Sequence, residues 1–295
     1  REPDMHEPSG DLRRLIEAVE TQWSDRVTGS ITCDLHVIQT LQPILRAGKW
    51  RVTVALRNGT DIIAVWPGLK EQVVGVAIDV GSTTISAHLC DMVTGHVLAS
   101  TGAMNPQIRF GEDLMSRVSY GIMNPDGTGE MTTAVRGGLQ NLIDGAAEQA
   151  GLQREDVVEI VLAGNPVMHH LLLGIDPIEL GGAPFALAVD SAVELSAAQI
   201  GIVANKGARV YVLPCIAGHV GADAAAVVLA EAPQKSEEMM LIVDVGTNAE
   251  IIVGNKQRLL AASSPTGPAF EGHKYRLASV PRREPSNVFV LIKIH

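Results

Sequence analysis

Residues 78–84 read Ile-Asp-Val-Gly-Ser-Thr-Thr, and residues 243–249 read Val-Asp-Val-Gly-Thr-Asn-Ala. The two stretches align without a gap, so that Asp79 matches Asp244 and Gly81 matches Gly246. In each of them an apolar run ends in Asp-Val-Gly followed by a hydroxyl-bearing residue, and a second apolar run comes after it. The pattern predicts a buried strand, a tight glycine turn and a second strand, twice in one chain.

Both turns have the chemistry of an anion-binding loop. Glycine lets the backbone approach an anion closely, and successive N–H groups and hydroxyls can surround phosphate oxygens. An aspartate beside such a loop can hold Mg²⁺ directly or through water. A single Asp-x-Gly turn is more often a structural hairpin, and two ordinary hairpins are the alternative interpretation. The duplication favours two loops that face each other and clamp the phosphate chain of a nucleotide.

The sequence around the two turns predicts alternating strands and helices. Apolar runs bounded by glycine turns predict strands, and apolar residues at helical spacing predict helices. We expect strands at 73–80, 85–90, 96–101, 157–163, 210–213, 240–244 and 250–253, and helices at 114–121, 131–150, 166–173 and 221–230.

The N-terminal stretch 1–72 predicts a separate small α+β unit. Helical spacing covers 12–23 and 36–47, although Pro43 is expected to kink the second helix or to delay its start. Two β-branched runs at 50–56 and 61–66 flank Asn58-Gly59, which is a strong hairpin signal.

Composition excludes several classes of protein. The chain has 295 residues, enough for two domains, and a formal charge of −10, which disfavours a nucleic-acid partner. Acidic residues interrupt the longest apolar runs, so no membrane span is expected. Cys33, Cys90 and Cys215 lie too far apart in sequence to form a zinc or iron–sulfur motif. A cytoplasmic location fits these features.

Both ends of the sequence look atypical. The chain begins with arginine, which we interpret as an internal boundary of a longer polypeptide. The stretch 273–295 carries five basic side chains and one acidic one, so the stretch 1–272 has a charge of −14 and the tail +4. We interpret this basic tail as a truncation or an altered reading frame, with a solvated tail as the alternative.

The motifs together resemble a known family. The repeated turn is similar to the two phosphate motifs of the ASKHA, or actin-like ATPase, superfamily, which includes sugar kinases, actin and heat-shock chaperones. More narrowly, residues 75–272 resemble the ATPase domain of reductive activators of corrinoid proteins. The stretches that carry this resemblance are GVAIDVGSTT (75–84), NPQIRFGEDLMSRV (105–118), LAGNPVMHHLLLG (162–174), PCIAGHVGADAAA (214–226), DVGTNAEI (244–251) and SSPTGPAFEG (263–272). Residues 1–72 are similar to the small domain that precedes the ATPase domain in that family.

The resemblance implies an α/β fold of the ribonuclease-H-like kind. One lobe would be nearly complete and the second only begun, with a small α+β domain in front; the expected boundaries are 1–72, 73–272 and 273–295. The implied function is ATP-dependent reductive activation of a corrinoid protein of a methyltransferase system, by a homodimer that uses ATP and Mg²⁺. The family's 2Fe–2S cluster belongs to a ferredoxin domain that this sequence lacks, and the loop that packs on adenine is not found, so we expect an incomplete nucleotide site.

The matching motif positions imply roles for individual residues. Asp79 and Asp244 would organise Mg²⁺ directly or through water. Asp223 would orient the attacking water or only cap a helix, and Asn165 would contact the γ-phosphate or make an Asx-turn, the interpretation that we favour. The phosphate cradle would consist of Gly81, Ser82, Thr83, Thr84, Gly246, Thr247 and Asn248.

Several alternatives stay open. Glu250 is either part of the metal shell or a solvated strand residue. His169 and His170 suggest cobalt ligation, but adjacent helical residues point in different directions, so a structural role is favoured. At the level of function, a small-molecule kinase of the same superfamily and a non-catalytic binding module are the competing hypotheses.

Overall fold

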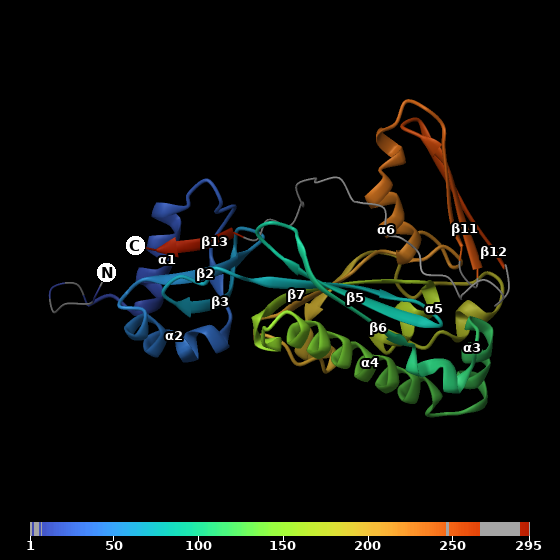
Figure 1. Cartoon of the computed structure of the whole chain (residues 1–295), viewed down its shortest axis with the longest axis horizontal. Helices are drawn as coiled ribbons and strands as arrows, with labels where there is room; N and C mark the ends of the chain where they lie inside the picture. The colour runs from blue at the N-terminus through green and yellow to red at the C-terminus, as the bar shows by residue number, and fades with distance from the viewer. Residues whose placement is uncertain (1, 3–5, 7, 246–247, 266–289, 295) are drawn as a thin grey trace.

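The structure is a computed structural model that describes residues 2, 6, 8–245, 248–265 and 290–294 (Figure 1). Within the described residues the strands form three sheets, of four, six and three strands. The predicted mixed α/β class is confirmed. The repeated Asp-Val-Gly stretches end strands of two different sheets.

The small N-terminal unit contains α1 (Asp11–Gln22), α2 (Leu35–Ala47) and a sheet in the order β1-β3-β2-β13. The turn between the second and third strands passes through Asn58 and Gly59, whose φ angles are 53° and 74°, as predicted for this hairpin. Helix α2 begins at Leu35 with Pro43 inside it, so the proline does not delay its start. The strands are β1 (Thr32–Cys33), β2 (Val52–Arg57), β3 (Asp61–Pro67) and β13 (Val290–Ile294).

The central sheet has the strand order β6-β5-β4-β7-β9-β8. β4 (Val74–Val80), β7 (Val157–Gly164) and β9 (Arg209–Val212) run parallel to one another. β5 (Thr84–Asp91), β6 (Val97–Met104) and β8 (Val193–Ser196) are antiparallel to their neighbours. Since ligands of such sheets bind at the carboxyl ends of parallel strands, the ends of β4 and β7 are the place to look for a site.

Helices cover the central sheet on the face that carries alternate β4 residues. Val76 and Ile78 are 2% and 3% exposed and belong to one apolar cluster with Leu139 of α4. Helix α4 (Gly127–Gln149) runs along β5 and β6, as Figure 1 shows, with α3 (Leu114–Met123) and α5 (Pro166–Leu173) near its N-terminal half. Short 3₁₀ helices connect these elements: η1 (Pro106–Phe110), η2 (Arg154–Asp156), η3 (Ile178–Gly181) and η4 (Ala197–Ile200).

The third sheet is an antiparallel meander of β10 (Met240–Val245), β11 (Asn248–Asn255) and β12 (Arg258–Pro265). Helix α6 (Ala222–Glu231), followed by η5 (Pro233–Lys235), packs on one face through a cluster that includes Ala224, Ile242 and Ile252. On the opposite face Leu241, Val243 and Leu260 are 67%, 49% and 50% exposed. Figure 1 shows α6 and this meander beyond the end of the central sheet that lies away from the small unit.

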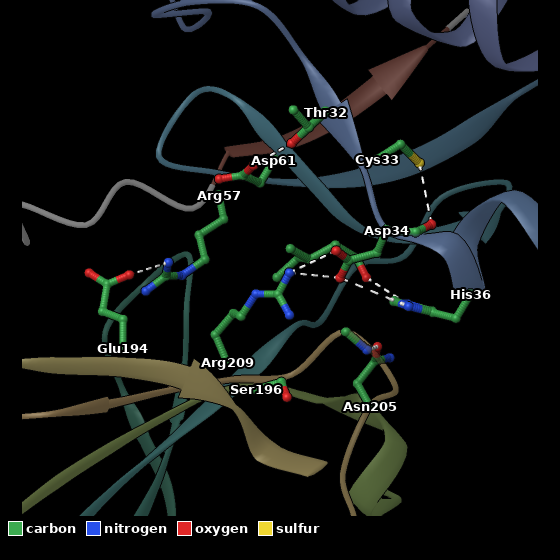
Figure 2. Close-up of polar contacts among 12 residues, drawn as sticks. Thr32, Cys33, Asp34, His36, Arg57, Asp61, Glu194, Ser196, Asn205 and Arg209 are labelled. Atoms are coloured by element: carbon green, nitrogen blue, oxygen red, sulfur yellow. Dashed lines mark hydrogen bonds and ion pairs between the residues drawn. The ribbon is translucent and has the colours of Figure 1, made fainter. Parts of the chain in front are cut away.

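The small unit joins the central sheet at the opposite end from the first turn (Figures 1 and 2). Arg57 donates to Glu194 at 2.8 Å and to Glu159 at 3.4 Å. Arg209, the first residue of β9, donates to both carboxylate oxygens of Asp34 at 2.8 Å. These charged contacts attach the small unit to β7, β8 and the start of β9, whereas the first turn follows the end of β4.

Most predicted elements are present, with shifted ends. Helix α4 begins at Gly127 rather than at 131. Strands β1, β8, β12 and β13 were not predicted. Residues 290–294 of the predicted tail pair with β2 as β13, and 273–289 lie outside the described residues. Across the described part of the chain, no helix combines the length and apolar character needed to cross a bilayer.

Candidate functional site

The first turn occupies residues 81–83, between β4 and β5. A Cβ on Gly81 would lie 2.5 Å from the carbonyl oxygen of Thr84, closer than any real Cβ contact. The position therefore requires glycine because the chain folds back on itself here. Ser82, Thr83 and Thr84 follow directly, so their backbone groups lie just past the end of β4.

Three segments that are far apart in sequence meet beside this turn. A Cβ on Gly164, the last residue of β7, would lie 2.9 Å from the carbonyl oxygen of Val80. A Cβ on Gly221, just before α6, would lie 2.6 Å from Cα of Asn165 and 2.7 Å from the carbonyl oxygen of Gly164. The two glycines let the end of β4, the start of α5 and the start of α6 approach at backbone contact.

Carboxyl groups gather at the same place. The pKa of Asp79 is raised to about 6, chiefly by the enclosing protein atoms and then by the nearby charges of Asp223 and Asp244. Burial also raises the pKa of Asp223 to about 6, with a further contribution from Asp244, although a hydrogen bond from the Ala224 N–H opposes the rise. The side chain of Asp79 keeps solvent-exposed area, so its carboxyl is accessible to a ligand.

Glu250 belongs to this acidic cluster as well. It lies directly across from Asp244 in the β10–β11 ladder, and burial and the charge of Asp223 raise its pKa to about 7. Its Oε1 accepts a hydrogen bond from the Ser263 hydroxyl at 3.2 Å. Like charges held this close repel each other unless a proton or a cation compensates.

The acidic cluster suits Mg²⁺ in its usual protein setting. Mg²⁺ is commonly held by one or two carboxylates, with water and substrate phosphates completing its shell. Among the described residues, no three His, Cys, Asp or Glu side chains are arranged to hold a metal by themselves. Asp79 and Asp244 therefore fit an ion that is shared with phosphate oxygens, and do not form a closed protein cage.

The structure brings together most of the residues that the sequence singled out. Asp79, Asp223 and Asp244 interact electrostatically, although they come from distant parts of the sequence. Asn248 begins β11, and Gly246 and Thr247 lie outside the described residues. Asp223 is the second residue of α6, whose N-cap is Gly221, and its Oδ1 accepts the N–H of the next residue, Ala224, at 2.8 Å; α6 has no side-chain cap, so Asp223 does not cap this helix.

Two other candidates, Asn165 and His170, have hydrogen-bond partners within the fold. Oδ1 of Asn165 accepts the Met168 N–H at 3.0 Å and caps α5, which agrees with the favoured Asx interpretation. His169 and His170 are each 1% exposed within the fold. The Nδ1 of His170 lies 2.9 Å from the Pro166 carbonyl, and its Nε2 accepts the Ala188 N–H at 3.0 Å, which holds the ring in place.

Two residues that contact the first turn were given no role from sequence. Asn105 and Arg117 both donate to carbonyl oxygens of the turn, and both lie in the stretch 105–118 that carries part of the family resemblance. The only signal in the sequence was that resemblance, because these contacts depend on how η1 and α3 fold back onto the sheet.

Family models match nearly the whole chain. The RACo middle region matches residues 74–236, the RACo linker region matches 1–72, and the C-terminal domain of RACo, the ASKHA domain, matches 238–279. A solved structure, a reductive activator for corrinoid, iron-sulfur protein, is 34% identical with a TM-score of 0.82, over 92% of this chain and 43% of that one. The chain thus has the fold of that activator.

Two curated proteins are also similar. The corrinoid activation enzyme RamQ of Eubacterium limosum is 31% identical over 277 residues, which are 88% of this chain and 46% of RamQ. The Co(II) methylated amine-specific corrinoid protein reductase of Methanosarcina barkeri is 27% identical over 210 residues, 67% of this chain and 37% of that protein. The chain therefore spans less than half the length of each of these relatives.

Proposed function

Since the chain belongs to the RACo family, we propose that it supplies the nucleotide-binding part of a reductive activator of corrinoid proteins. The partner would be a corrinoid protein of a methyltransferase system, because the similar proteins are named as activators or reductases of corrinoid proteins. The electron would come from a 2Fe–2S cluster outside this sequence, which has no cysteine motif for one. We further propose a cytoplasmic homodimer.

The observation that carries the proposal is the meeting of Asp79, Asp223 and Asp244 beside the glycine turn. Asp79 and Asp244 occupy equivalent positions of the internal repeat, and each lies near the end of a strand. Their mutual charge effect is part of the raised pKa of Asp79. Two hairpins with a purely structural role do not require their acidic residues to face one another, and facing like charges lower stability unless a cation is bound.

In the proposed mechanism the two turns hold the phosphate chain of ATP. Backbone N–H groups and hydroxyls of residues 81–84 contact phosphate oxygens, and Asp79 and Asp244 hold Mg²⁺ directly or through water. Bound Mg²⁺ neutralises negative charge on the phosphates. Asp223, at the start of α6, orients the water that attacks the γ-phosphate in line, so positioning and electrostatics lower the barrier.

Binding and hydrolysis of ATP would bias the partner toward a state in which its cobalt accepts an electron. In that scheme the electron passes from the 2Fe–2S cluster to the cobalt of the partner, and this chain uses ATP to favour the partner conformation that accepts it. An ATPase with no corrinoid partner would hydrolyse ATP at the same rate with or without a corrinoid protein. Stimulation of ATP hydrolysis by a corrinoid protein therefore distinguishes the proposed activator from such an ATPase.

The assignment of Asp79 and Asp244 is tested by calorimetric titration of Mg·ATP into the chain and into Asp79→Asn and Asp244→Asn. Each substitution keeps the shape of the side chain and removes its charge, so we expect affinity to fall by at least about tenfold. Asp25→Asn is the matched control, since Asp25 is an exposed residue that pairs with its neighbour Arg26. Unchanged affinity in both site variants would overturn the proposed function.

A further inference from the structure

We infer that Asn105 and Arg117 are positioning residues that hold the first phosphate turn in its binding conformation from the protein side. The inference rests on the proposed function of this turn. It gives a role to the stretch 105–118, which contains η1 and the start of α3. These residues lie outside the acidic cluster and have no part in the mechanism above.

Asn105 contacts the turn at two points. Its Nδ2 donates to the carbonyl oxygen of Gly81 at 2.7 Å, and its backbone N–H donates to that of Thr83, also at 2.7 Å. Its Oδ1 accepts the Gln107 N–H at 2.9 Å, which fixes the amide and caps η1. Because Asn105 is 1% exposed, water does not compete for these bonds.

Arg117 contacts Ser82, which lies between Gly81 and Thr83 in the turn. Its Nη2 donates to the carbonyl oxygen of Ser82, while its Nε donates to that of Gly111 at 3.0 Å. Its Nη1 lies 3.4 Å from Oε1 of Gln107 and 3.0 Å from Sδ of Met168. The side chain of Arg117 is completely buried, so these bonds to protein groups are shielded from water. A charged side chain is rarely buried so fully unless it has partners in the protein, and here one of them is a carbonyl of the first turn.

Three successive carbonyls of the turn, at residues 81, 82 and 83, are therefore held from the same side. A trans peptide directs the N–H of the next residue opposite to the carbonyl. Holding the carbonyls of Gly81 and Ser82 thus directs the N–H groups of Ser82 and Thr83 away from Asn105 and Arg117. That is the orientation in which backbone N–H groups can face a phosphate.

The arrangement reduces the cost of binding. A turn that begins with glycine has many accessible conformations when it is free, and ordering it on binding would reduce affinity. Here its peptide groups are already oriented in the protein alone. The buried positive charge behind the turn also strengthens the dipoles that point toward an anion.

The first experiment compares Asn105→Asp and Arg117→Lys with two matched controls. Asn105→Asp keeps the acceptor for Gln107 and loses the donor to Gly81, and Arg117→Lys keeps the charge and loses the planar fork. The controls Asn124→Asp and Arg136→Lys make the same chemical changes away from the turn. Nδ2 of Asn124 donates to the Tyr120 carbonyl at 2.9 Å, and Nε of Arg136 donates to the Leu172 carbonyl at 2.9 Å.

Calorimetry with Mg·ATP is the readout. We expect each turn variant to bind on the order of tenfold more weakly, while the controls bind like the parent chain. Parent-like binding by both turn variants would overturn this inference and leave the proposed function intact. Absence of binding by the parent chain would overturn the proposed function and this inference together.

A second measurement starts from the unsubstituted chain, so its decisive part does not depend on a variant that folds. In the unsubstituted chain, addition of Mg·ATP is expected to shift the amide resonances of Ser82 and Thr83 and to slow their hydrogen exchange. If the chain binds Mg·ATP and those two amides do not respond, the turn is not oriented toward the phosphates and the inference is wrong. In Asn105→Asp the same two amides are expected to exchange at least about tenfold faster than in the parent, with the β4–β5 ladder unchanged.

Discussion

Asp79 is the residue at which the chemistry of the site is most concentrated. It lies near the end of β4, keeps solvent-exposed area, and is influenced by the charges of Asp223 and Asp244. A carboxylate in this environment is unfavourable for the folded chain at neutral pH and favourable for a bound cation. The closeness of these carboxyl groups therefore explains both their mutual repulsion and their ability to hold Mg²⁺.

The pH dependence of stability follows from these carboxyl groups. With pKa values of about 6, Asp79 and Asp223 retain protons in the folded state that the unfolded chain loses from about pH 4 upward. Stability is therefore lost as the pH rises from about 4 to 6, and the loss persists above this range. We expect Asp79→Asn to unfold at a higher temperature than the parent chain at pH 8, with the difference shrinking toward pH 4. Thermal unfolding across this range measures it.

Asp25→Asn serves as the control for this pH series, since Asp25 is exposed and lies far from the site in sequence. Its unfolding temperature should follow that of the parent at every pH. A gain from Asp79→Asn that is the same at pH 4 and pH 8 would show that lost charge repulsion is not its cause.

Among single residues, the sequence was informative where the chemistry lies in a local motif. The repeat pointed to Asp79 and Asp244, and the dipeptide Asn58-Gly59 predicted its own turn. Asn105 and Arg117 had no such signal, because their partners are backbone carbonyls brought near by η1 and α3. For Asp223 and Asn165 the sequence could offer only alternatives, since an oxygen acceptor near a helix start is as typical of a cap as of a ligand site, and only Asn165 caps its helix.

Strands β4–β6 and strands β10–β12 each form an antiparallel meander around one copy of the repeated turn. The two meanders differ in which face a helix packs against. In the first copy α4 packs over the face that includes Ile78, which is 3% exposed. In the second copy the equivalent position, Val243, is 49% exposed, and α6 packs on the opposite face. Equivalent positions of the repeat therefore contribute differently to stability.

Alanine substitution at the two equivalent positions tests this difference. We expect Ile78→Ala to lower the free energy of unfolding by roughly 2–5 kcal/mol, because a buried side chain leaves a cavity. Val243→Ala should change it by no more than about 0.5 kcal/mol, because the side chain is half exposed. Urea unfolding of both variants gives the comparison, and equal losses would mean that the second face is covered in solution.

At the scale of elements, the sequence predicted the long and strongly patterned ones. It missed β8, whose four residues Val-Glu-Leu-Ser have too short an alternation to stand out. It also missed β12, an edge strand with small and polar residues whose assignment depends on pairing with β11. Short strands of this kind are defined by their neighbours, and a local pattern does not reveal them.

The whole molecule places the small unit and the candidate site at opposite ends of the central sheet. The contact of Arg209 with Asp34, drawn in Figure 2, lies at the start of β9, whereas Asp79 of the acidic cluster lies near the end of β4. The sequence predicted the two units and could not predict how they meet, because Arg209 and Asp34 are 175 positions apart.

A double-mutant cycle of Arg209→Ala and Asp34→Ala measures the strength of this junction. The two side chains are 24% and 29% exposed, so we expect a coupling energy of about 0.5–1 kcal/mol in urea unfolding. Since the junction is remote from the acidic cluster, Mg·ATP affinity should be unchanged. A large loss of affinity would show that the small unit and the nucleotide site are coupled.

The central claim is that the turn after Asp79 and the turn after Asp244 bind one nucleotide through one divalent ion. Replacing Mg²⁺ by paramagnetic Mn²⁺ in the presence of ATP tests it most directly, because resonances near the ion broaden. We predict simultaneous broadening of amide resonances from Thr83 in the first turn and Asn248 beside the second, at one equivalent of Mn·ATP. Broadening of one turn alone, or of neither, would contradict the claim.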